Sequence, residues 1–126
     1  MSDSNQSRIK TFLQAEYRDA RSAVDAGKTA EAWRHLQRAH IVAQGMLAPH
    51  IYSHWRMLRL AIKTSDVREI RGQLMRLALA PLGNLSGRLP IGNTGRSDVS
   101  AFVRMDIPAD LQAILGAGSQ QAQHKQ

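Results

Sequence analysis

The sequence matches itself at a shift of 38 residues, with no gap, over the segment from residue 17 to residue 76. The matched pairs are Tyr17 with Trp55, Arg18 with Arg56, Arg21 with Arg59, Ala23 with Ala61, Val24 with Ile62, Glu31 with Glu69, Leu36 with Leu74 and Arg38 with Arg76. A repeat of this length is typical of helical hairpins that stack on one another. Arrays of this kind usually need three or more units. Two units therefore predict either a tetratricopeptide-like pair of hairpins or a closed four-helix bundle.

Apolar residues recur at helical spacing in four segments, which are separated by turn or capping residues. We expect helices over residues 7–26, 30–44, 49–63 and 66–80. Thr29 can cap the second helix, and Ser65 or Asp66 can cap the fourth. Pro81 should stop the fourth helix, because proline removes a helical hydrogen bond. The predicted fold class is all-α, with two antiparallel helical hairpins.

The composition changes after residue 80, where Gly, Asn, Ser and Pro become frequent and indicate loops with sharp turns. Apolar residues still punctuate this segment. We therefore expect an ordered strap over residues 81–107 that lays Leu85, Leu89, Val99 and Phe102 against the helices. A short helix should follow and end near residue 115.

Length and composition predict one domain. We expect a flexible N-terminus at residues 1–7, a single helical domain at 8–115 and a disordered tail at 116–126 that contains His124. The chain has no cysteine, its first ten residues lack the apolar region of a secretory signal, and its apolar runs are too short to span a membrane. These features predict a cytoplasmic protein with no membrane partner.

The net charge of +7 is unevenly spread, since residues 34–104 hold eleven basic and three acidic side chains. Such a surface is either a solvated helix face or a binding face for an anionic partner, for which an acidic protein segment is our first candidate. Nucleic acid is less favoured, because no recognised motif accompanies the charge. Trp33 and Trp55 lie on apolar helix faces, so we expect both in the core rather than as platforms for bases.

Three of the five histidines surround one predicted corner between helices, which Gly45 and Pro49 mark. His50 and His54 are four residues apart and share a helix face. In an antiparallel arrangement, His40 lies near the level of His54. The sequence therefore brings three imidazoles to one place.

A carboxylate can complete this set. Glu16 lies opposite residue 40 across the first hairpin, and the 38-residue shift places it on His54. Together with His40 and His50, these residues make a feasible ligand set for Zn²⁺, Cu²⁺ or Ni²⁺, with Zn²⁺ or Cu²⁺ as our first candidates. Met46 and Met57 are near enough in sequence to suit Cu(I). The alternative is that the histidines only pack and form hydrogen bonds at the corner.

Catalytic chemistry has little support. There is no nucleophile elbow, and three glutamates are too few for a di-iron bundle. The glycine-rich segments GNLSG and PIGNTGR lack the strand–loop–helix context of a phosphate site, so turns explain them better. In these turns Asn84 and Asn93 suit positive φ. We expect a binding protein rather than an enzyme.

The segments RAHIVAQ, HIYSHWRML, LAPLGNLSGRLPIGNTG, VSAF and IPADLQAIL resemble a small bacterial family of unknown function, over roughly residues 15–115. Members of such families tend to occur near heavy-metal-resistance genes, so the resemblance implies a link to metal handling. His40, His50 and His54 stand at the family's own histidine positions. Residues 20–39 also resemble a tetratricopeptide hairpin. The leading hypothesis is transition-metal buffering, delivery or sensing, and the alternative is a tetratricopeptide-like adaptor with an arginine-rich face.

Overall fold

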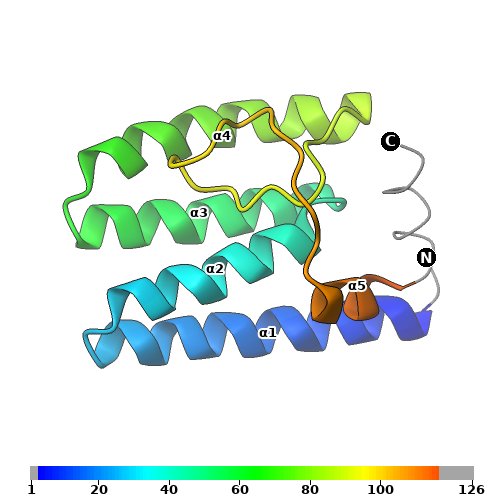
Figure 1. Ribbon diagram of the computed structural model, residues 1–126, viewed down its shortest axis with the longest axis horizontal. Coiled ribbons are helices and arrows are strands. Elements are labelled where there is room, and N and C mark those ends of the chain that lie inside the picture. Colours follow the sequence, from blue (N-terminus) through cyan, green and yellow to red (C-terminus); the bar gives the residue numbers. More distant parts are fainter. Residues whose placement is uncertain (1–2, 117–126) are drawn as a thin grey trace.

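The computed structural model describes residues 3–116 and contains five helices and no strand within that range (Figure 1). They are α1 (Asp3–Asp25), α2 (Thr29–Ala43), α3 (Leu47–Lys63), α4 (Val67–Ser86) and α5 (Ala109–Leu115). The predicted all-α class is confirmed. Residues 117–126 of the expected tail, His124 included, lie outside the described residues.

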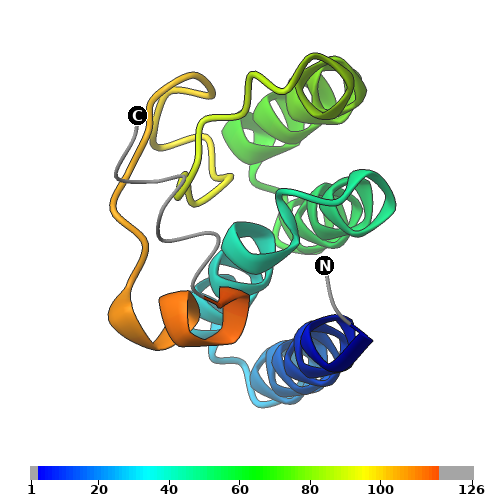
Figure 2. The same ribbon diagram turned by 90° about the vertical axis from the view of Figure 1, so that its right-hand side faces the viewer.

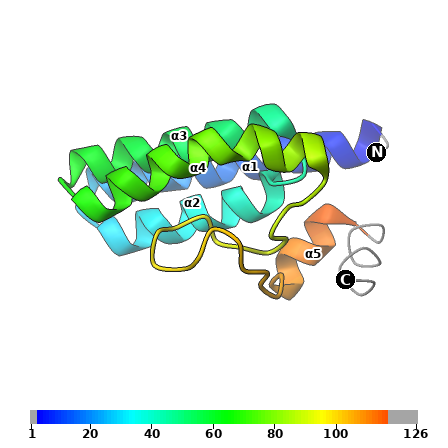
Figure 3. The same ribbon diagram turned by 90° about the horizontal axis from the view of Figure 1, so that it is seen from above.

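The helices form two antiparallel hairpins that stack in chain order (Figures 1 and 2). α1 packs on α2, α2 on α3, and α3 on α4. α1 and α4 do not pack on each other within residues 3–116, so the arrangement is an open stack of helices rather than a closed four-helix bundle. This leaves the stack with two side faces. The strap and α5 cover the face made by α2 and α4, and the opposite face is made by α1 and α3 (Figures 2 and 3).

The two hairpin turns have the same backbone geometry, which shows the repeat in three dimensions. Gly27 has φ 74° and Ser65, at the matching position, has φ 55°. The amide of Lys28 donates to Ala23 O at 2.8 Å, and the amide of Asp66 to Ala61 O at 2.9 Å. Both hydrogen bonds close a helix C-terminus on a left-handed residue. The second unit therefore keeps the turn although it has lost the glycine.

Several helix boundaries differ from those predicted. α1 begins at Asp3, so most of the expected flexible N-terminus is helical, and α3 begins two residues before Pro49. Gly45 does not adopt a positive φ. Lys28, rather than Thr29, occupies the N-cap position of α2, and its side chain makes no capping hydrogen bond. Asp66 does cap α4, because its side chain accepts from the Glu69 amide at 3.2 Å. These differences leave the two-hairpin order unchanged.

Pro81 does not stop α4. It lies inside the helix, which continues to Ser86. Gly87 is the C-cap residue and has a φ of 73°. The prediction was wrong because proline removes one amide donor without forbidding further turns when the surroundings hold them. The strap therefore begins after Gly87 rather than at residue 81, and the added turn carries Asn84 to the histidines.

Alanines dominate the core between α1, α2 and α3, where they let the helices approach closely around Trp33, Leu36 and Met57. A second apolar cluster joins α1, α2 and α5 through Ile9, Val42 and Leu111, among other residues. Trp33 is buried as predicted. The three residues Trp55, Ile62 and Leu74 are instead 48%, 56% and 54% exposed.

The exposure of Leu74 follows from the two-unit stack. Leu36 occupies the matching position of the first hairpin and is 3% exposed. The second hairpin covers Leu36, but no third unit covers Leu74. The same helical pattern thus predicts a buried face in both units, but only the first unit has a neighbouring hairpin that covers this face.

Polar contacts organise the strap, and Ile91 and Ile107 pack it on the apolar cluster that contains Leu111. Of the four apolar residues that were expected to anchor it, Leu89 and Val99 are half-buried. Leu85 and Phe102 are 79% and 74% exposed, so the prediction is wrong for both. Instead, Asn93 inside the strap is buried and donates to Ser100 O and Val103 O, each at 2.8 Å. Arg76 of α4 donates to two further strap carbonyls.

Within residues 3–116, none of the helices combines the length and the apolar character that a membrane span requires.

Candidate metal centre

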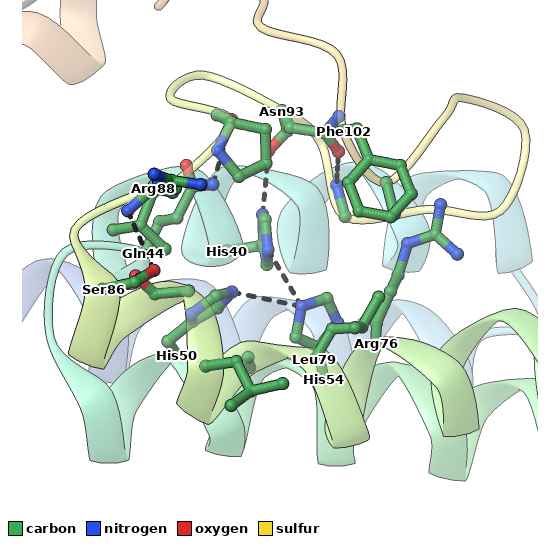
Figure 4. A pocket seen from close by; sticks show the side chains of 17 residues that line it. His40, Gln44, His50, His54, Arg76, Leu79, Ser86, Arg88, Asn93 and Phe102 are labelled. Carbon is green, nitrogen blue, oxygen red and sulfur yellow. Dashed lines mark hydrogen bonds between the residues drawn. The ribbon is translucent and has the colours of Figure 1, made fainter.

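His40, His50 and His54 converge at the corner between α2 and α3 (Figure 4). The Nε2 atoms of His40 and His54 are 3.1 Å apart, and those of His54 and His50 are 3.2 Å apart. One ligand atom from each ring lies within 4.8 Å of the other two. The predicted convergence of these three residues is therefore observed, and all three side chains are buried.

The positions of the three histidines along α2 and α3 bring their rings together. His40 lies in the last turn of α2, and His50 and His54 lie one turn apart on α3. The strap closes the site at Gly95, whose φ is 86°. A Cβ atom there would lie 2.7 Å from Cγ of His40, so only glycine lets the strap reach the ring.

The Nδ1 atom of every ring faces an oxygen. These oxygens are Asn93 O at 2.8 Å from His40, Asn84 Oδ1 at 2.7 Å from His50, and Gln73 Oε1 at 2.8 Å from His54. A backbone carbonyl can only accept a hydrogen bond, so Nδ1 of His40 carries the proton.

The same conclusion holds for His50 and His54, because the two amide groups are themselves oriented by acceptors. Nδ2 of Asn84 donates to Gln44 O at 3.0 Å. Nε2 of Gln73 donates to Gly95 O at 2.9 Å and to Glu69 Oε2 at 3.1 Å. The amide oxygens must therefore face the rings, and both Nδ1 atoms donate.

A neutral imidazole carries one N–H group, so its second nitrogen is an acceptor. With Nδ1 protonated in all three rings, three Nε2 lone pairs point at one place and no hydrogen atom lies between them. The 3.1 and 3.2 Å separations are therefore not hydrogen bonds between neutral rings. A cation, a proton or a hydrogen-bond donor placed among the three nitrogens would turn this repulsion into attraction.

The surroundings keep the rings neutral. Burial lowers the pKa of His40 well below its usual value, and the neighbouring histidines add to the effect. Burial also lowers the pKa of His50, and it lowers the pKa of His54 to about 3. Nearby Arg76 lowers the pKa of His40 and His54 further. The neutral form is the one that coordinates a metal ion.

Glu16 lies elsewhere. Its carboxylate accepts from Nδ1 of His35 at 2.6 Å and from Nε of Arg38 at 3.0 Å, so the structure does not bring it to the three histidines. The repeat explains this placement. The pair Glu16–His35 matches the pair His54–Gln73 of the second hairpin, and both contacts stay within their own hairpin.

The two methionines also lie apart from the cluster. Met57 is fully buried in the alanine-rich core, and Met46 packs on the cluster that contains Leu111. Neither lines the cavity beside the histidines. The sequence-based suggestion of a softer Cu(I) site that uses these residues therefore has no structural support.

The residues that orient the rings were missed by the sequence reasoning. Asn84 and Asn93 were predicted to take positive φ in turns, but neither does. Gln73 could have been found from the repeat, because the shift places His35 on it. Glu69 supports Gln73 and is itself held by Arg96 and Ser97 of the strap, each at 3.0 Å.

A cavity of about 290 Å³ opens beside the histidines, between α4 and the strap (Figure 4). Its walls are mainly apolar and include Leu79, Leu89 and Phe102, while Arg76 and Arg88 are its charged residues. The three rings could hold a metal ion, and all three line this cavity.

Fold and site together define a small all-α protein that buries three converging imidazoles where two stacked hairpins meet. The chain belongs to a family of unknown function. A family model described as "Protein of unknown function (DUF3703)" matches residues 7–115. No curated protein and no solved structure matches the chain.

Proposed function

We propose that this protein binds one transition-metal ion through the Nε2 atoms of His40, His50 and His54. The observation that carries the proposal is the convergence of three acceptor nitrogens whose opposite ring nitrogens all donate to oriented oxygens. Histidines that ligate metals commonly show this pattern, because the outer hydrogen bond selects the tautomer and raises the basicity of the ligand.

The donor set favours Zn²⁺ or Cu²⁺. Imidazole nitrogen suits both ions, whereas Ca²⁺ and Mg²⁺ require oxygen. Zn–N bonds of about 2.0–2.1 Å in tetrahedral geometry separate the nitrogens by about 3.3 Å. Two of the observed separations, 3.1 and 3.2 Å, are close to this value.

Three ligands beside a cavity favour reversible handling of the metal over a purely structural role. Structural zinc sites usually have four protein ligands, whereas three ligands leave a position for water or an incoming donor. Metal buffering, delivery or sensing fits this arrangement.

The test uses the full chain without an affinity tag, titrated with Zn²⁺ and with Cu²⁺ in a calorimeter at neutral pH. We expect one equivalent to bind to the wild type and binding to be lost in His54→Ala. The matched control is His35→Gln, which also removes one histidine. The repeat already places a glutamine at the equivalent position, so this variant should fold and bind normally.

The alternative is that the histidines are only structural. If the wild type binds neither ion, or if His54→Ala binds as tightly as His35→Gln, the proposed metal centre is wrong. Circular dichroism of each variant identifies a loss of binding that comes from unfolding. In that case His54→Gln, which keeps a polar side chain at this site, replaces His54→Ala.

A further inference from the structure

The face of the stack opposite the strap carries a groove between α1 and α3 with a cavity of about 770 Å³. Ile9, Leu13, Met46 and Pro49 are apolar residues of its lining. Next along the same two helices lies a second cavity of about 490 Å³, which shares Arg21 and Arg56 with the first. The described residues thus form one long concave surface on this face.

The charge of this groove is one-sided. Lys10, Arg18, Arg21 and Arg56 line the first cavity, and none of its lining residues is acidic. The second cavity adds two more cations and one acidic residue, Asp25. Arg18 does approach Asp19 at 3.8 Å, but both side chains are exposed, and such a pair contributes little. The excess positive charge is therefore open to an incoming anion.

The repeat builds this charge into the groove. The matched pairs Arg18/Arg56 and Arg21/Arg59 lie on α1 and α3, the two helices that flank it. The third matched pair, Arg38 and Arg76, is engaged in contacts within the protein. Arg38 binds Glu16 and Asp110, and Arg76 donates to carbonyls of the strap. The matched arginines on α1 and α3 are less engaged. Arg56 donates to the Tyr52 hydroxyl at 3.3 Å and to Tyr17 O at 3.4 Å, but it makes no ion pair within residues 3–116.

Two tyrosines lie at the centre of the groove. The rings of Tyr17 and Tyr52 meet edge to face at 5.2 Å, and the Arg56 guanidinium lies over Tyr17 at 4.8 Å. The Tyr17 hydroxyl is buried and has no hydrogen-bond partner within residues 3–116. Because the rings contact each other edge to face and Arg56 lies over Tyr17, these tyrosines are poor platforms for nucleic-acid bases.

We infer that this groove binds an acidic peptide segment of another protein, whose apolar side chains enter the groove while its carboxylates meet the arginines and lysines. Charge complementarity favours this occupant. A concave, apolar lining fits inserted side chains better than it fits a flat layer of lipid headgroups. The chain's own C-terminal residues 117–126 contain no acidic side chain, so they do not supply the complement.

The experiment measures fluorescence anisotropy of a labelled peptide in which glutamate and leucine alternate, added to the full-length protein. Two further peptides replace every glutamate by lysine or every leucine by serine. We expect tight binding of the first peptide alone, and weaker binding as salt rises, because screening shortens the reach of the charges.

The groove variant is Arg18→Glu with Arg21→Glu. Its matched control is Arg34→Glu with Arg71→Glu, which changes the net charge equally at exposed residues outside the groove. All four side chains are exposed, so both proteins should fold. We expect the groove variant to bind the acidic peptide at least about tenfold more weakly than the control does.

Three results would overturn the inference. The groove variant could bind as tightly as the control, which would place the contact elsewhere. The serine-containing peptide could bind as well as the leucine-containing one, which would show charge attraction without a groove. Finally, oligothymidylate or phosphatidylserine vesicles could bind more tightly than the acidic peptide, which would assign the face to nucleic acid or to membrane lipid.

Discussion

At the scale of single residues, the histidine cluster makes stability depend on pH. The three rings are neutral in the folded protein because their pKa values are lowered, whereas an unfolded histidine has a pKa of about 6.5. Below that pH the unfolded chain binds more protons than the folded chain. Stability must therefore fall as the pH drops below about 6.5 and must be complete above it.

Urea denaturation of the metal-free protein across a pH series checks this expectation. Each histidine can contribute a slope of up to about 1.4 kcal/mol per pH unit between pH 6.5 and its folded pKa. His54→Gln should reduce the slope by the share of one ring. Stability that stays flat from pH 7 to pH 5 would show that the rings titrate freely in the fold.

Residue types and spacing were sufficient to predict the three histidines, because spacing on a helix and the order of two hairpins place them together. The same reasoning failed for Glu16. The position of Glu16 opposite residue 40 does not show which other side chains compete for its carboxylate. In the structure, His35 and Arg38 of the same hairpin bind it. The oxygens of Asn84 and Asn93 could not be predicted either, because they reach the rings only through the path of the strap and the extra turn of α4.

At the scale of the elements, the hairpin turns offer a direct comparison of glycine and serine at one backbone conformation. Ser65 is exposed and adopts φ 55°, which costs a residue with a Cβ atom about 1–2 kcal/mol. Ser65→Gly should raise the free energy of unfolding by a few tenths to about 1 kcal/mol, after the larger chain entropy of glycine is subtracted. Gly27→Ser, the matched reverse change, should lower it. A loss of stability in Ser65→Gly would contradict the left-handed turn.

The strap provides a second comparison between polar and apolar anchoring. Asn93→Ala removes two donated hydrogen bonds and the acceptor for the Gly95 amide at 2.8 Å, so it should cost roughly 2–3 kcal/mol. Phe102→Ser changes an exposed side chain and should stay within about 0.5 kcal/mol of the wild type. Thermal or urea denaturation of both variants decides. Equal losses would mean that apolar packing holds the strap after all.

At the scale of the whole molecule, the open stack makes matched positions unequal. Leu36→Ala removes a buried side chain and should cost about 2–5 kcal/mol. Leu74→Ala, at the same register of the terminal hairpin, removes a side chain that is 54% exposed and should cost less than about 1 kcal/mol. Urea denaturation measures both. Similar costs would indicate that a further surface covers α4 in solution.

The helix order and the two hairpins were predictable from the repeat, since they depend on local pattern. The repeat left open whether the hairpins form an open stack or a closed bundle, because that depends on which helices pack on each other. The faces that stay exposed could not be predicted from the repeat, because burial depends on how many units follow. The exposed Trp55 and Leu74 both occupy positions that a longer array would cover. The continuation of α4 through Pro81 likewise depends on tertiary contacts and not on local propensity.

The proposed metal centre requires that three neutral imidazoles present their Nε2 lone pairs to one point. Heteronuclear NMR of the imidazole nitrogens reads the tautomer of each ring directly. In the metal-free protein at neutral pH, we expect His40, His50 and His54 all to carry the proton on Nδ1. Adding one equivalent of Zn²⁺ should then shift the Nε2 resonances of these three rings and leave His35 unchanged. A proton on Nε2 in any of the three rings, or resonances that do not respond to the metal, would contradict the account.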